Sequence, residues 1–248
     1  MIILKSPSEI EKMRISNTIV AEILSEIKAL IKPGVTTIEL NERCEWLCHK
    51  KGAIPAFKGY RGYPCSLCTS VNEEVVHGIP SKRILKEGDI ISLDFGVLYD
   101  GYFGDAAITV PVGVVSEKAA LLIETTEQAL YLGIEKAIHN NRISDISFAV
   151  QRHVESRGFS VVRKFVGHGI GKSLHEDPQI PNFGKPGQGP RLKPGMVLAI
   201  EPMVNAGRSE VEVLSDGWTA VTKDRSLSAH FEHCIAITEN GAEILSKI

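Results

Sequence analysis

The order of elements predicted for this chain, two helices followed by strands, occurs twice. Capping-box patterns that begin at Ser6 and Thr36 predict two helices, the second ending near Gly52. Helical patterns return over residues 117–139 and 144–157, and predicted strands follow each pair of helices. A repeat of this length favours two similar halves within one α/β chain.

Short sequence matches support the repeat. Residues 85–94, LKEGDIISLD, align without gaps with residues 192–201, LKPGMVLAIE, at an offset of 107 residues. The alignment places Asp94 on Glu201, so a carboxylate ends the same predicted strand in both halves. If a pseudo-two-fold axis relates the halves, these two carboxylates should face each other across it.

A predicted hairpin in the first half carries two aspartates. Residues 93–105, LDFGVLYDGYFGD, contain an Asp-Gly dipeptide at 100–101 that is typical of two-residue turns between antiparallel strands. With this turn Gly96 would face Asp105, and Asp94 would lie diagonally from Asp105 on the same face. Two carboxylates so placed raise each other's pKa or need a cation between them. The hairpin alone also allows a solvated face with two ordinary surface acids.

Further ligand-type residues fall on predicted strands or in a tight turn. The last strand, SAHFEHCIAIT at 228–238, alternates so that His230, Glu232 and Cys234 share one face. His168 lies in a glycine-flanked turn. Together, these candidates form a set of four carboxylates and one imidazole: Asp94, Asp105, Glu201, Glu232 and His168. Such a set suits a pair of divalent first-row ions.

Composition argues against several other functions. The formal net charge is −2, with no long block of like charges, so no pattern indicates binding to nucleic acid or to a membrane surface. The first residues lack a signal-peptide pattern and no apolar run is long enough to span a membrane, so we expect a soluble, cytoplasmic protein. A single C-x-x-C without a second pair favours structural thiols over a zinc or redox pair. The cysteines are odd in number and irregularly spaced, as expected in a reducing compartment: Cys44, Cys48, Cys65, Cys68 and Cys234.

Four segments, in this order and spacing, resemble the bacterial form of type I methionine aminopeptidase, in peptidase family M24: DFGVLYDGYFGDAAIT, GHGIGKSLHEDP, AIEPMV and SAHFEHCIAIT. The resemblance covers essentially the whole chain. It implies the α/β (α+β) pita-bread fold, in which an antiparallel sheet covered by helices is built from two pseudo-symmetric halves. We therefore expect a single catalytic domain over residues 1–248, with halves of approximately 1–113 and 114–248.

The resemblance also implies a metal site and catalytic residues. Two divalent ions, Fe, Mn, Co or Zn, would be held by Asp94, Asp105, His168, Glu201 and Glu232. Glu201 would also carry a proton from water to the leaving amine. His77 would hydrogen-bond the scissile amide, and His175 would stabilise the developing oxyanion. His230 and His233 match no assigned role and are expected to be structural.

A pocket for the first side chain of the substrate follows from the same resemblance. Its expected lining is Tyr60, Tyr63, Cys68, His77, His175, Met203 and Trp218. Bacterial members of the family often have Phe at the position of Leu174. This difference affects the expected closure and selectivity of the pocket. Backbone carbonyls near Asn72, Glu74 and Ser228 would form a monovalent-cation site.

The implied activity is removal of the N-terminal initiator methionine from nascent proteins and peptides when the second residue is small and uncharged. A metal-activated water would attack the first peptide bond. The expected partners are nascent N-termini at the ribosome, and the expected state is a monomer. Two alternatives keep the fold: a proline-directed aminopeptidase or dipeptidase, which usually carries a large extra N-terminal domain, and a non-catalytic binding protein, which would have lost the ligand residues found here.

Overall fold

Two pairs of helices each precede a group of strands, in the order predicted from the sequence. The computed structural model describes residues 1–247. The helices are α1 (Pro7–Lys28), α2 (Thr37–Lys50), α3 (Glu117–Lys136) and α4 (Ile143–Ser156), with a short 3-10 turn, η1 (Tyr60–Gly62). The strands are β1 (Ile54–Pro55), β2 (Cys68–Val71), β3 (Glu74–Val76), β4 (Ile90–Tyr99), β5 (Tyr102–Pro111), β6 (Ser160–Val161), β7 (Gly167–Gly169), β8 (Glu176–Ile180), β9 (Val197–Ile200), β10 (Met203–Asn205), β11 (Val211–Val213), β12 (Ala220–Thr222), β13 (Ser228–His230), β14 (Glu232–Thr238) and β15 (Gly241–Ile244).

The first two helices begin at the predicted caps. At α1 the Ser6 hydroxyl accepts from the Glu9 backbone N–H, and the Glu9 carboxylate accepts from the Ser6 backbone N–H. The same reciprocal bonds join Thr36 and Glu39 at α2. Each box satisfies backbone donors that the first helical turn leaves free. The other two helices also form, with ends a few residues from those expected.

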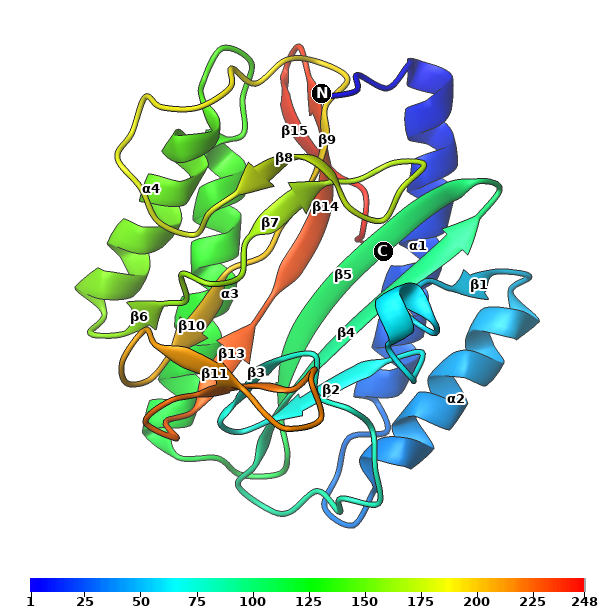
Figure 1. Cartoon of the computed structure of the whole chain (residues 1–248), viewed down its shortest axis with the longest axis vertical. Helices are drawn as coiled ribbons and strands as arrows, with labels where there is room; N and C mark the ends of the chain where they lie inside the picture. The colour runs from blue at the N-terminus through cyan, green and yellow to red at the C-terminus, as the bar shows by residue number, and fades with distance from the viewer. Residues whose placement is uncertain (248) are drawn as a thin grey trace.

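One large antiparallel sheet joins the two halves. Its strand order is β1-β4-β5-β14-β9-β7-β8, with β2 on β4 and β15 on β14. Strand β5 of the first half pairs with β14 of the second through Ala107 and Glu232. Two three-stranded sheets, β13-β10-β6 and β11-β12-β3, complete the structure. In Figure 1, α1 and α2 lie on one side of the molecule and α3 and α4 on the other.

The two halves bury equivalent apolar faces. One core cluster joins α1 and α2 to β4, and another joins α3 and α4 to β9 and β14. A loop contact also recurs: the Leu85 N–H donates to the Val35 carbonyl, and the Leu192 N–H donates to the Asn141 carbonyl. Leu85 and Leu192 are the first residues of the two aligned segments, so the repeated sequence makes the same contact in each half.

The predicted last strand is divided at Phe231. Residues 228–230 form β13, which pairs with β10 in a small sheet, whereas β14 begins at Glu232 and pairs with β5 and β9. A one-strand prediction for 228–238 was therefore wrong, because the chain passes from one sheet to another there. No helix within residues 1–247 is long and apolar enough to cross a membrane.

Candidate metal centre and substrate cavity

The β4–β5 hairpin brings Asp94 and Asp105 to one cavity. Its register is the predicted one: Gly96 lies opposite Asp105, and the turn residues Asp100 and Gly101 have φ values of 46° and 79°. These values belong to the primed turns that match the twist of a hairpin. Gly96 also provides space, since a Cβ there would lie 2.8 Å from Phe57 Cε1 and 3.2 Å from Asp105 Oδ1.

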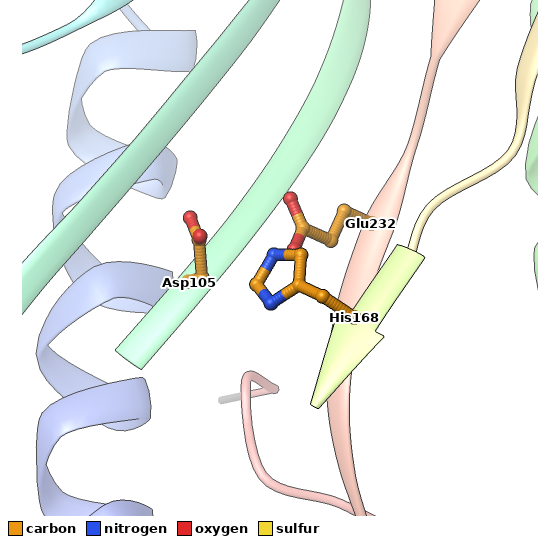
Figure 2. A group of neighbouring side chains, drawn as sticks. All are labelled: Asp105, His168 and Glu232. Atoms are coloured by element: carbon orange, nitrogen blue, oxygen red, sulfur yellow. The ribbon is translucent and has the colours of Figure 1, made fainter. Parts of the chain in front are cut away.

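Three further candidate ligands come from strands of the same sheet. Glu232 begins β14, and Glu201 directly follows β9. His168 was expected in a glycine-flanked turn, which was wrong, because it is the middle residue of β7 and pairs with β8 and β9. Figure 2 shows the side chains of Asp105, His168 and Glu232 turned toward one another from three strands. Their possible ligand atoms all lie within 4.8 Å of one another. Glu201 Oε1 lies 3.5 Å from His168 Nε2, which places the fourth carboxylate beside this group.

The carboxylates of this cluster are poorly compensated by the protein. Asp105 and Glu232 are 4% and 3% exposed. Within residues 1–247, Asp94 Oδ1, Asp105 Oδ1 and Glu232 Oε1 have no hydrogen-bond partner. Burial raises the pKa of Asp94 to about 7. Burial and the neighbouring carboxylates raise the pKa values of Asp105, Glu201 and Glu232 well above their usual range. Buried acids of this kind fit a bound cation, which would compensate their charge.

His168 is prepared to act as a neutral ligand. Its Nδ1 lies 2.9 Å from the Gly169 carbonyl oxygen, which can only accept, so the ring proton belongs on Nδ1 and the lone pair on Nε2. Burial lowers the pKa of His168 to about 4. The ring is therefore neutral at pH 7, with Nε2 on the side of Glu201. A backbone bond of this kind commonly orients metal-bound histidines.

A cavity of about 150 Å³ opens next to the cluster. All five candidate ligands line it, and so do most of the residues expected to form the pocket. The remaining lining residues are Phe57, Tyr60, Arg61, Tyr63, Cys68, His77, Leu174, His175 and Trp218. Sequence reasoning assigned no role to Phe57 or Arg61, because both lie in irregular backbone before or within η1, where no periodicity indicates direction.

Met203 is the one expected pocket residue that does not line this cavity in the described part of the chain. It is completely buried and belongs to a core cluster with Val75, Val162 and Ala220. The reason is tertiary: β10 lies between β13 and β6 in a small sheet, and Met203 packs into the core beneath that sheet.

His175 is held by an aromatic neighbour. Its ring stacks on Tyr60 with centroids 5.3 Å apart, and Nδ1 lies 2.9 Å from the Tyr60 hydroxyl. The His168 ring is 4.3 Å away, centroid to centroid. Burial, with His168 as a smaller cause, lowers the pKa of His175 to about 3. His175 therefore faces the cluster as a neutral ring.

His77 also lines the cavity, in an aromatic setting. Its ring packs edge-on against Phe165 and Trp218, with centroids 5.5 and 6.3 Å away. Burial lowers the pKa of His77 to about 4. Its backbone has a φ of 62°, an uncommon value for a non-glycine residue that is often found at functional positions.

His230, which we expected to be structural, is brought next to the cluster. Its Nε2 lies 3.7 Å from Glu201 Oε2, and the residue is 1% exposed. Burial lowers the pKa of His230 to about 3. The sequence held a partial signal, since the predicted strand put His230 on the face of Glu232, but only the fold places Glu201 beside it.

The segments proposed for a monovalent cation do meet. The Ser228 backbone N–H donates to the Asn72 carbonyl oxygen at 2.8 Å, and the Glu74 carboxylate accepts from the Val71 N–H at 2.7 Å. Binding of a cation there stays a prediction.

A helix-covered antiparallel sheet with two similar halves, and buried oxygen ligands where those halves meet, defines the class of pita-bread metallohydrolases. Within that class, the chain belongs to metallopeptidase family M24, whose sequence profile matches residues 11–239.

Similar proteins cover the whole chain. Methionine aminopeptidase 1 of Bacillus subtilis is 56% identical over 248 residues, which is 100% of both chains. The crystal structure of methionine aminopeptidase from Thermotoga maritima superposes with a TM-score of 0.99 at 51% identity, again over 100% of both chains. The prolidase from Pyrococcus furiosus is more distant, with a TM-score of 0.80 and 25% identity over 99% of this chain and 66% of that one.

Proposed function

We propose that this protein is a methionine aminopeptidase, which removes the N-terminal methionine from nascent proteins and peptides whose second residue is small and uncharged. The observation that carries the proposal is the buried cluster of Asp105, His168 and Glu232 beside a narrow cavity with an aromatic wall. Relatives named for this activity, at more than half identity over their full length, support it.

The carboxylates and the histidine fit divalent metal ions. Unpartnered buried carboxylate oxygens and a neutral imidazole form a donor set that borderline first-row ions prefer. We infer that two such ions, Fe, Mn, Co or Zn, are held by Asp94, Asp105, His168, Glu201 and Glu232. When bound, they would supply Lewis acidity toward a peptide carbonyl and make a water molecule reactive at neutral pH.

Three side chains would then act on the substrate. Glu201 would take the proton of the attacking water and pass it to the leaving amine. It lies 3.5 Å from His168 and also lines the cavity, so it can reach both the metal ligands and a bound substrate. His175 would donate to the developing oxyanion. When the Tyr60 hydroxyl donates to Nδ1 of His175, the ring proton is left on Nε2, so a neutral donor is available. His77, which also lines the cavity, would hydrogen-bond the scissile amide.

The cavity wall suits an unbranched apolar side chain. Tyr63 packs edge-on against Trp218 at 5.2 Å, and its hydroxyl donates to the Gly78 carbonyl at 2.9 Å. Cys68 and Leu174 are buried and line the same cavity. A wall fixed by packing and by a backbone bond would accept a flexible thioether and would exclude β-branched residues.

The proline-directed alternative is not favoured. The prolidase is far less similar than the methionine aminopeptidases, and this chain covers 66% of it. A binding protein without activity is also disfavoured, because all five ligand residues are present and all line the cavity.

Several finer expectations belong to the same proposal. We propose a single catalytic domain over residues 1–248, a monomer that acts on nascent N-termini at the ribosome, and a monovalent cation near Asn72, Glu74 and Ser228. We also propose a cytoplasmic location. All five cysteines are free and four are buried, which suits a reducing compartment.

Hydrolysis of three peptides would test the function. The protein would be chelated, then reloaded anaerobically with Fe²⁺, Mn²⁺ or Co²⁺ and given peptides that begin Met-Gly, Met-Ile or Ala-Pro. We expect release of methionine from Met-Gly alone, and its loss in Asp105→Ala. Cleavage of Ala-Pro alone would establish the proline-directed alternative, and no cleavage with any metal would contradict catalysis.

A further inference from the structure

His230 is a buried histidine to which the proposed reaction assigns no part. Among residues 1–247, neither Nδ1 nor Nε2 of its ring has a hydrogen-bond partner. Nearly all buried polar atoms in folded proteins are bonded, so an unbonded imidazole next to a reaction site calls for an explanation. One explanation is that the His230 ring forms its hydrogen bond only when metal is bound in the site.

The backbone of His230 is fixed on both sides of its Cα. Its N–H donates to Thr109 Oγ1 at 2.8 Å, and the Thr109 hydroxyl donates to the His230 carbonyl at 2.8 Å. Since the Thr109 proton is used in that bond, the Ser92 hydroxyl, also at 2.8 Å, must donate to Thr109. These bonds hold the chain where it passes from β13 to β14, and they define where the His230 ring can lie.

The ring lies against one particular oxygen of Glu201. Oε2 of Glu201 is 3.7 Å from His230 Nε2, whereas Oε1 is 3.5 Å from His168 Nε2. Glu201 therefore stands between two histidines, with one carboxylate oxygen toward each. Oε1 is thus the Glu201 oxygen that lies 3.5 Å from a member of the Asp105–His168–Glu232 cluster.

We propose that His230 is a positioning residue for Glu201: its neutral Nε2–H donates to Oε2 and thereby leaves Oε1 free for a metal ion on the side of His168. This inference rests on the proposed function. The present separation is slightly longer than a hydrogen bond, and such bonds commonly tighten when a site is loaded. A donor behind a ligating carboxylate fixes its orientation, and losing one typically weakens metal binding by about 10- to 100-fold.

A direct metal ligand is the competing role for His230. All five candidate ligands line the cavity, whereas His230 is not among the lining described for residues 1–247. Its Nε2 instead lies 3.7 Å from Oε2 of Glu201, whereas His168 lies near Oε1. The geometry therefore favours a donor to the carboxylate over a ligand to the ion.

Metal titration of matched variants tests the proposal. Anaerobic calorimetry with Mn²⁺ would give dissociation constants for chelated wild type, His230→Leu and His230→Gln. We expect a 10- to 100-fold weaker constant for His230→Leu, which has no donor. His230→Gln retains an N–H of similar reach and should stay within about threefold of wild type. At saturating Mn²⁺, kcat for a Met-Gly peptide should fall in His230→Leu with little change in KM.

A control and a second variant separate positioning from folding. His233→Gln alters a part-buried histidine that bonds Ser246 and faces Tyr131, outside the catalytic cavity, and it should bind Mn²⁺ as wild type does. If His230→Leu does not fold, His230→Asn replaces it, because its shorter amide should not reach Glu201. Weak binding by the Asn variant with near-normal binding by the Gln variant would support the proposal, and equal binding by the two would overturn it.

Two further outcomes would also overturn it. One is a folded His230→Leu variant with an unchanged Mn²⁺ constant. The other is a change in the d–d bands of bound Co²⁺ in His230→Leu that indicates loss of a nitrogen ligand, since a donor to Glu201 leaves the number of protein ligands unaltered. Release of methionine by the wild type is measured in parallel. If the wild type is active, a negative result with the variants contradicts only the role of His230 and not the proposed function.

Discussion

The hydroxyl of Tyr60 lies 2.9 Å from Nδ1 of His175, and the two rings stack with centroids 5.3 Å apart. The pKa of His175 is lowered to about 3, chiefly by burial, so the ring is neutral at pH 7 and carries one proton, on either Nδ1 or Nε2. A donated tyrosine proton at Nδ1 leaves an N–H at Nε2. A Tyr60 hydroxyl that accepts from Nδ1–H would instead leave Nε2 as an acceptor, and the proposed reaction needs the first arrangement.

Replacing Tyr60 with Phe should lower kcat for Met-Gly peptides by about 10-fold, because the tautomer that donates to an oxyanion is no longer selected. The stacking surface is kept, so KM and thermal stability should change little. Tyr131→Phe is the control, since Tyr131 lies 3.4 Å from His233 outside the catalytic cavity. Steady-state kinetics would decide, and an unchanged kcat in Tyr60→Phe would contradict the assignment.

The metal-free protein should lose stability as pH rises above about 6.5. The folded-state pKa values of Asp94, Asp105, Glu201 and Glu232 are raised by burial, so the folded protein keeps protons that the unfolded chain releases. Stability then falls with rising pH, by about 1.4 kcal/mol per pH unit for each proton still held. The buried histidines have lowered pKa values, so they make stability rise with pH between those values and their ordinary pKa of 6.5. Above pH 6.5 they no longer change the stability.

Urea unfolding of chelated protein between pH 6.5 and 8.5 would measure this slope. Asp105→Asn removes one of the acids and should flatten the slope, and saturating Mn²⁺ should abolish it in wild type. A stability that rises over this range without metal would show that the carboxylates are already ionised in the folded state.

Lys5 and Glu176 form a buried ion pair, with Nζ 2.5 Å from Oε2 and side chains 4% and 8% exposed. Glu176 directly follows His175, so this pair supports the segment that carries a cavity histidine. Lys5→Met leaves a carboxylate buried without its partner and should lower the free energy of unfolding by about 3–5 kcal/mol.

The double variant Lys5→Met/Glu176→Leu should regain most of that loss, because apolar residues of similar volume need no compensating charge. Lys12→Met, which breaks an exposed pair with Asp100, should change stability little. Urea unfolding of the four proteins would settle the point, and a Lys5→Met variant as stable as wild type would refute it.

Leu174→Ala should widen the substrate pocket. Leu174 is 2% exposed and lines the cavity, whereas Ile170, in the same core cluster, is 0% exposed and is not part of the lining described for residues 1–247. Both alanine variants should be destabilised by about 2–5 kcal/mol. Only Leu174→Ala should raise kcat/KM for peptides with a bulkier first residue relative to methionine. Identical selectivity in the two variants would show that Leu174 does not shape the pocket.

Local sequence was sufficient for the hairpin and the helix starts. The Asp-Gly turn and the two-residue period of a strand placed Asp94 and Asp105 on one face, and the structure has that register. The capping boxes at Ser6 and Thr36 begin helices where expected, because their hydrogen bonds span only three residues. The repeat and the strand pattern also selected five ligand-type residues, but their individual roles came from resemblance to a family and remain proposals.

Contacts between distant segments were decided by the tertiary structure alone. Met203 is buried away from the cavity lining because β10 belongs to a small sheet, and the last strand is divided at Phe231 because the chain changes sheets there. His230 reaches Glu201 only because β13 and the end of β9 are brought together. Periodicity reports which residues share a face of one strand. It carries no information on which other strand that face will meet, since that choice depends on packing over the whole chain.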